Sequence, residues 1–162
     1  MKLFVKNKIL SWGGSSFVLD ENDKQVFTVK GKIFSPTRKK LIYDADKNLK
    51  FIVRNKFWKF FNTSAFIFDA YKNKVARISN NDFDFRNKFK LRDCPDEIEI
   101  NGTFRHFSVV KNGKEIGTID RQFTIVRDAF VVDVFDPDEA AFLVAITISL
   151  DNIRDKQRND NR

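Results

Sequence analysis

One stretch near the C-terminus, DPDEAAFLVAITISLD at residues 136–151, decides how the rest of the chain must fold. It predicts a helix over about residues 137–152. Asp136 can cap the first turn, Pro137 suits the first helical position, and Glu139 stands where a capping-box acid reaches back to the cap. These acids also lie at the positive end of the helix dipole, which stabilises the same start.

The predicted helix has almost no polar side. Between Ala140 and Leu150, only Thr147 and Ser149 interrupt the apolar residues that surround the helix axis. A helix that is apolar all round either spans a membrane or is enclosed by protein. A membrane span needs about 20 apolar residues, and this run reaches roughly half that number before Asp151. We therefore expect a helix that the rest of the chain encloses.

The remainder of the chain repeats one pattern. Alternating apolar residues run into a turn rich in Asp, Asn and Lys, and a second set of alternating apolar residues follows. This pattern predicts four β-hairpins, at residues 17–29, 41–53, 66–78 and 107–119. The clearest turn is Asn112-Gly113, because both residue types tolerate a positive φ.

Further strands are predicted between and around these hairpins. They are a hairpin over residues 89–100, a first strand at residues 3–10, and last strands at residues 124–126 and 130–132. A long twisted meander of antiparallel strands tends to curl closed, because closure removes its edges. The sequence therefore predicts a mostly β (α+β) fold, a closed antiparallel barrel wrapped around the buried C-terminal helix. The alternative is an open β-sandwich with the helix packed at one end, which would require a polar stripe along the helix.

Length and composition are those of one soluble globular domain. The 162 residues are enough for a single core, which we place at residues 1–152, followed by a polar tail at 153–162 that is expected to fray. A formal charge of +8 predicts attraction to anions. The lone Cys94 suits a reducing cytosol. Lys6 and Lys8 interrupt any signal-peptide apolar region, so a cytoplasmic location is expected.

Nothing in the sequence indicates catalysis. His106 is the single histidine, which rules out a site with several histidine ligands, and a partly exposed strand position is the simpler interpretation. Cys94 precedes Pro95 in a turn and lacks the surroundings that lower a thiol pKa. Gly13-Gly14 joins two strands, whereas a phosphate loop leads into a helix. We therefore expect a protein that is not an enzyme and that needs no metal and no cofactor.

The candidate binding residues lie in two basic segments. RNKFWKFFN at residues 54–62 alternates rings and cations so that both strand faces are partly apolar, which is typical of a surface at a membrane–water interface. The alternative is that these rings fill the barrel and cover its outside under a loop. SPTRKK at residues 35–40 is a basic turn that can hold a phosphate or stay solvated. The candidate residues are Arg38, Lys39, Lys40, Arg54, Lys56, Trp58, Lys59 and Phe60.

Several stretches together resemble a known family. They are residues 3–8 with 11–13, the hairpin start at 17–21, the strand IVRNK at 52–56 and the helix end at 150–151. The chain is similar to the bacterial members of the LURP-one-related family, within the tubby C-terminal-domain-like superfamily. The resemblance implies a barrel of about twelve strands around a central helix, and its motifs are structural and carry no catalytic signature. Tubby relatives bind phosphoinositides and scramblase relatives act at membranes.

Scramblase relatives are also associated with an acidic calcium-binding segment before the helix. In this chain Asp133, Asp136 and Asp138 fall in that region, but they lack the spacing of a calcium loop, and helix capping explains the last two.

Two kinds of partner fit the basic charge. A monomeric barrel that binds anionic membrane lipid as a peripheral protein is the first hypothesis. Nucleic-acid binding is ranked lower, because rings at alternating strand positions are expected to point into the barrel rather than onto one groove. A scaffold that recruits a protein partner cannot be separated from the lipid hypothesis by sequence, and a catalytic barrel would need a cleft that the helix is expected to fill.

Overall fold

The computed structural model describes residues 1–6, 15–31, 35–55, 64–79, 88–103, 105–122 and 129–160, with only the backbone for residues 6, 15, 89, 129 and 154–160. Twelve antiparallel strands form one sheet. The strands are β1 (Lys2–Lys6), β2 (Ser15–Asp20), β3 (Gln25–Gly31), β4 (Lys40–Asp44), β5 (Leu49–Asn55), β6 (Ser64–Asp69), β7 (Lys74–Ser79), β8 (Lys88–Lys90), β9 (Ile98–Thr103), β10 (His106–Lys111), β11 (Lys114–Gln122) and β12 (Ala129–Val134).

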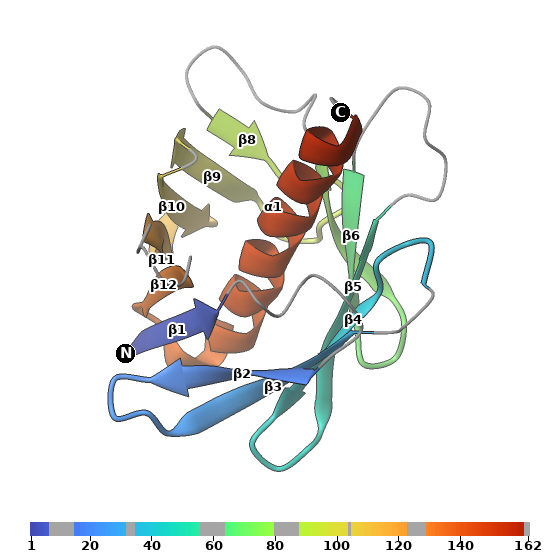
Figure 1. Ribbon diagram of the computed structural model, residues 1–162. Helices are drawn as coiled ribbons and strands as arrows, with labels where there is room; N and C mark the ends of the chain where they lie inside the picture. The colour runs from blue at the N-terminus through green and yellow to red at the C-terminus, as the bar shows by residue number, and fades with distance from the viewer. Residues whose placement is uncertain are drawn as a thin grey trace.

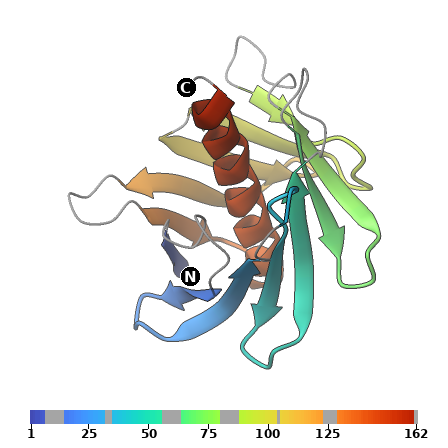
Figure 2. The ribbon, with the colours of Figure 1, turned by 45° about the vertical axis from the view of Figure 1, so that its right-hand side comes forward.

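The sheet curls around one helix. Its strand order is β7-β6-β5-β4-β3-β2-β1-β12-β11-β10-β9-β8, so the first and last strands of the chain, β1 and β12, pair at its middle. Figure 1 shows β8 to β12 on one side of the helix and β4 to β6 on the other, with β2 and β3 joining the two sides below. Figure 2 shows the same wrapping after a turn of the view. All the predicted hairpins are confirmed, while the strand predicted at residues 124–126 lies outside the described residues.

Three of the hairpins share one turn. Asp20, Asp44 and Asp69 each accept a hydrogen bond on the side chain from the backbone N–H four residues later, at 2.8 to 2.9 Å. The residue before each donor has a positive φ, at Asp23, Lys47 and Lys72. The amide of Asn73 donates to the Asp69 carboxylate and holds the pKa of that carboxyl below its usual value. The repeated Asp therefore sets the turn, because its side chain satisfies a backbone donor that the sheet leaves unpaired.

The hairpin between β10 and β11 uses a different turn, as its sequence predicts. Asn112 and Gly113 have φ values of 50° and 80°. Two consecutive positive φ values match the right-handed twist of the strands they join.

The helix begins as predicted and ends later. The Asp136 side chain accepts from the backbone N–H of Asp138 at 3.2 Å, and a single 3₁₀ turn, η3 (Pro137–Glu139), leads into α1 (Ala140–Asp160). The predicted capping-box role of Glu139 is wrong. Its carboxylate contacts the Lys111 amine at 2.5 Å instead, because a charged partner from β10 forms a stronger hydrogen bond than a neutral N–H.

The C-terminal boundary of the helix also differs from the prediction. The backbone is helical to Asp160, where the sequence predicts an end near residue 152 and a fraying tail. No helix in the described part of the chain is long and apolar enough to cross a membrane.

The helix is enclosed along the length for which side chains are described. Every residue from Ala140 to Ile153 is buried. The hydroxyls of Thr147 and Ser149 donate to the carbonyls of Leu143 and Ala145, four residues earlier, at 2.8 and 2.7 Å. These two residues therefore need no polar partner outside the helix. An exposed polar stripe, which an open sandwich would require, is absent from residues 140–153.

The prediction of a closed barrel is confirmed only in its coarser part, a β-sheet wrapped around a buried helix. Strands β7 and β8 stand at the two ends of the strand order. Among the described residues, one isolated bridge joins β7 to the segment that follows β8, where Arg77 and Arg92 exchange backbone hydrogen bonds at 2.8 and 3.0 Å. A continuous ladder between the two ends of the sheet is therefore not shown.

Replacing Gly117 with Ala should destabilise the protein where the sheet meets the helix. A Cβ at Gly117 would lie 2.4 Å from the backbone oxygen of Asp133 and 2.7 Å from a methyl of Leu143. Overpacking of this kind costs about 2 kcal/mol, which lowers the melting temperature by about 4–8 °C. Differential scanning calorimetry measures the shift. Gly117 lies on β11 where this strand meets β12 and α1. An unchanged melting temperature would contradict the close approach of these three elements at Gly117.

Candidate functional site

The candidate binding residues fall into two groups. Lys56, Trp58, Lys59 and Phe60 lie outside the described residues, so their prediction stays untested. The others, Arg38, Lys39, Lys40 and Arg54, are described.

Lys40 does not belong to an exposed turn, and that prediction is wrong. It is the first residue of β4 and is 4% exposed, on the same strand face as the buried Ile42. Side chains alternate along a strand, so the register that points Ile42 into the core also points Lys40 inward. Residues 35–40 look like one loop in the sequence because they are polar, but β4 already begins at Lys40.

Arg38 and Lys39 lie in a compact turn that contacts β5. The hydroxyls of Ser35 and Thr37 are 3.1 Å apart, and Ser35 Oγ accepts from the backbone N–H of Lys39 at 3.1 Å. The carbonyl of Thr37 accepts from the backbone N–H of Asn55 at 2.7 Å. This last bond places the turn at the end of β5, one residue beyond Arg54. The structure thus brings Arg38 and Lys39 to the same end of the sheet as Arg54.

Arg54 is exposed on the outside of the sheet. Its guanidinium lies over the ring of Phe68, with 4.4 Å between the guanidinium carbon and the ring centroid. In the strand register Arg54 is opposite Phe66, and the rings of Phe66 and Phe68 are 6.4 Å apart. A cation held against an aromatic face keeps its charge available to solvent while its position is fixed.

Aromatic residues of the strands are predicted to lie inside the barrel, and for β6 this prediction is wrong. Ala65 and Ile67 are fully buried in the core, so Phe66 and Phe68 point outward and are half-buried. α1 packs against this strand, and the β6 side chains that face the core there are the small Ala65 and the branched Ile67. The signal in the sequence was the small Ala65 and the aliphatic Ile67 that alternate with the two rings.

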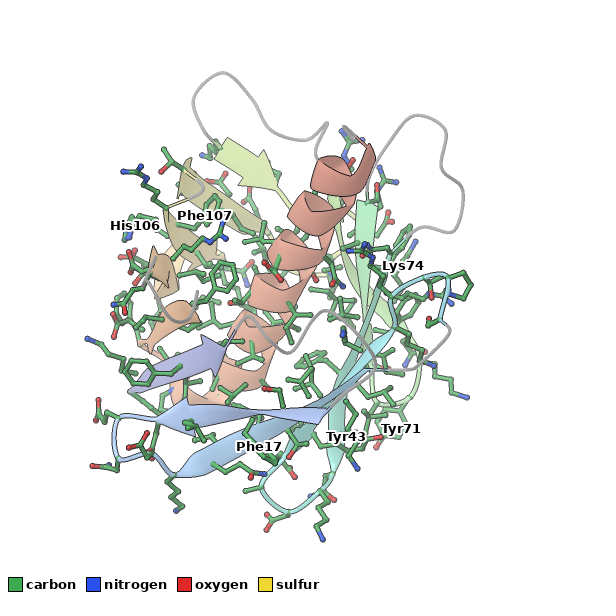
Figure 3. The ribbon with its side chains drawn as sticks, viewed as in Figure 1. Phe17, Tyr43, Tyr71, Lys74, His106 and Phe107 are labelled. Atoms are coloured by element: carbon green, nitrogen blue, oxygen red, sulfur yellow. The ribbon has the colours of Figure 1, made fainter. Side chains whose placement is uncertain are left out.

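Cations and rings continue across neighbouring strands on this side. We define the outer face as Lys30, Tyr43, Arg54, Phe66, Phe68 and Arg77. The Lys30 amine lies 5.2 Å from the Tyr43 ring centroid. Across the strands, Arg54 is opposite Phe66, Phe66 is opposite Arg77, and Arg77 is opposite Arg92. Figure 3 shows Phe17, Tyr43 and Tyr71 on the side of β2 to β7, far from His106.

The edge of the outer face near β8 is positive. The amine of Lys74 binds the carboxylate of Asp93 at 2.8 Å. The pKa of Asp93 is lowered chiefly by that hydrogen bond, with the charges of Arg77 and Arg92 adding to it. These three cations and one carboxylate leave an excess of positive charge, which attracts anionic surfaces.

The described residues show no catalytic or metal arrangement. His106 is exposed, as predicted, and its Nδ1 lies 2.7 Å from Asp120 Oδ1. Burial raises the pKa of the Cys94 thiol, which disfavours the reactive thiolate. No group of three or more His, Cys, Asp or Glu residues that could hold a metal ion occurs in the described ranges. Asp136 caps η3, and Asp133 lies 3.7 Å from the Lys2 amine.

Comparison with known proteins finds a match to a family model. No curated protein and no solved structure matches the chain. The model of the LURP-one-related family matches residues 1–151, which include the twelve described strands and most of the enclosed part of α1. The chain therefore belongs to the LURP-one-related family.

Proposed function

We propose that this protein is a binding module, not an enzyme, and that it docks peripherally on membranes containing anionic phospholipid. The outer face is the docking surface. The observation that carries the proposal is the exposed Arg54 guanidinium, fixed over Phe68 beside Phe66 and in one row with Arg77. Rings of this kind settle among lipid headgroups while the cations meet lipid phosphates.

The shape and charge of the surface agree with a broad, weakly specific contact. The outer face spans β3 to β7 and carries cations on three of these strands, at Lys30, Arg54 and Arg77. Each basic residue close to an anionic membrane contributes about 1 kcal/mol. The turn that holds Arg38 and Lys39 adjoins the end of β5 and extends the positive surface.

Replacing Arg54 with Glu should weaken binding to anionic vesicles by about 30-fold. The change removes one favourable charge and adds a repelled one, a difference of about 2 kcal/mol. Co-sedimentation with phosphatidylcholine vesicles, with and without phosphatidylserine, measures it. Lys114→Glu is the matched control, because it changes the charge by the same amount at a site far from the outer face. The Lys114 side chain is 75% exposed on β11, which is six strands away from β5 in the sheet.

Two results would contradict the proposal. One is equal pelleting of the wild-type protein with neutral and anionic vesicles. The other is an equal loss of binding in Arg54→Glu and Lys114→Glu, which would mean that net charge, and not the outer face, attracts the membrane.

Single-stranded nucleic acid is the second candidate ligand, and the same residues of the outer face favour it. Arg54, Phe66 and Arg77 stand side by side on a sheet surface, an arrangement that can receive stacked bases. We rank it second because the Arg54 guanidinium already covers the Phe68 ring. A gel shift with a single-stranded oligonucleotide at low salt separates the two candidates, since an unretarded oligonucleotide removes the second. Recruitment of a protein partner remains the third possibility, with the same surface.

A further inference from the structure

Polar side chains gather inside the molecule near the end of the enclosed part of α1. Lys40, Asn55, Asp151 and Asn152 are between 1% and 5% exposed. Lys40 is paired with Val53 in the strand register, and Asn55 is two residues further along the same face of β5. Asn55 contacts Asn152 on α1. This end of the interior is therefore polar, whereas the rest of the enclosed helix meets apolar side chains.

Two atoms in this cluster have no hydrogen-bond partner. Asn55 Nδ2 donates to the backbone oxygen of Asn152 at 3.4 Å, which fixes the orientation of the Asn55 amide because the reversed amide would set two oxygens against each other. Asn55 Oδ1 and Asn152 Nδ2 are buried and unpaired. The buried hydroxyls of Thr147 and Ser149 differ, since both bind carbonyls of their own helix.

Asn55 has an unpaired acceptor, and Asn152, which it contacts, has an unpaired donor. One shared partner would satisfy both atoms. Buried polar groups are almost always satisfied, and an ordered guest satisfies them when the protein does not. A hydroxyl group has the chemistry that both atoms require, because it can donate to Asn55 Oδ1 and accept from Asn152 Nδ2. The formal charges of the buried Lys40 and Asp151 are opposite and equal, so a neutral guest suits the site better than an ion.

We propose that Asn55 and Asn152 form an interior site for a neutral hydroxyl-bearing guest, either a water molecule or a small alcohol. The site is separate from the outer face, because Asn55 points inward from β5 while its neighbour Arg54 points outward. Its failure would therefore leave the proposed membrane docking untouched.

A high-resolution crystal structure of the wild-type protein, combined with native mass spectrometry, tests the proposal. We expect a density peak within hydrogen-bond distance of both Asn55 Oδ1 and Asn152 Nδ2. A matching excess mass on the intact protein would identify a small alcohol, and its absence would identify water. A map in which the two amides bind protein groups, with no peak between them, would overturn the proposal.

Two variants show whether the amide holds the guest. Asn152→Leu keeps a similar side-chain volume and removes the donor, so the peak should disappear. Thr147→Val also removes a buried polar group from α1, but one already satisfied by Leu143, so the peak should remain. Loss of the peak in Thr147→Val, or its survival in Asn152→Leu, would argue against the assignment. If Asn152→Leu does not fold, the wild-type map decides alone.

Discussion

Replacing Ile146 with Asp should leave the protein unable to fold. Ile146 is fully buried at the middle of the enclosed part of α1. An unpaired carboxyl group in a dry interior lowers the stability of the folded state by several kcal/mol, even when the group is protonated and neutral. A domain of this size is stable by about 5–15 kcal/mol, so one such change removes most or all of its stability. Far-UV and near-UV circular dichroism, with urea denaturation of any soluble fraction, measure the loss.

Ile146→Val is the control for this experiment. It removes one methylene from the same position and should cost only about 1 kcal/mol. A soluble Ile146→Asp variant that melts like the wild type would contradict the placement of this helix inside the sheet.

Replacing Lys40 with Glu should destabilise the protein by about 3–5 kcal/mol, the usual cost of breaking the charge arrangement around a buried ion. The sequence alone predicts a nearly silent change, because it places Lys40 in a solvated turn. The structure buries this amine at the start of β4. Urea denaturation gives the free energy of unfolding for both forms.

Lys39→Glu provides the comparison for Lys40→Glu. It makes the same charge change one residue earlier, before β4 begins and where the residue is half-buried, and should cost under about 1 kcal/mol. Equal stability of the two variants would show that the exposure of Lys40 does not differ from that of its neighbour. For membrane binding, Lys39 is therefore the residue of this turn to test.

Much of the fold can be predicted from the sequence because its signals are local. Alternation of apolar residues marks each hairpin, and the Asp of each repeated turn satisfies a backbone donor four residues on. Capping by Asp136 depends on residues within one turn of the helix. These features need no knowledge of what lies across the molecule.

The candidate site was predicted less well. Of the four candidate residues that the structure describes, Arg54 is exposed, Arg38 and Lys39 are half-buried, and Lys40 is inside. The rings of Phe66 and Phe68 were expected inside and lie outside. Alternation along a strand shows that odd and even positions face opposite sides of the sheet. When both sets of side chains are apolar, alternation does not show which set faces the core. That choice depends on how close α1 packs.

The sequence by itself determined that a short apolar helix must be enclosed and that hairpins are available to enclose it, because periodicity and capping act within a few residues. The tertiary structure decided the rest. It set β1 beside β12, extended α1 to Asp160, and buried Lys40 and Asn152 at one end of the interior. The strand pairing and the two burials depend on contacts between residues far apart in the chain, and such contacts leave no local pattern to read.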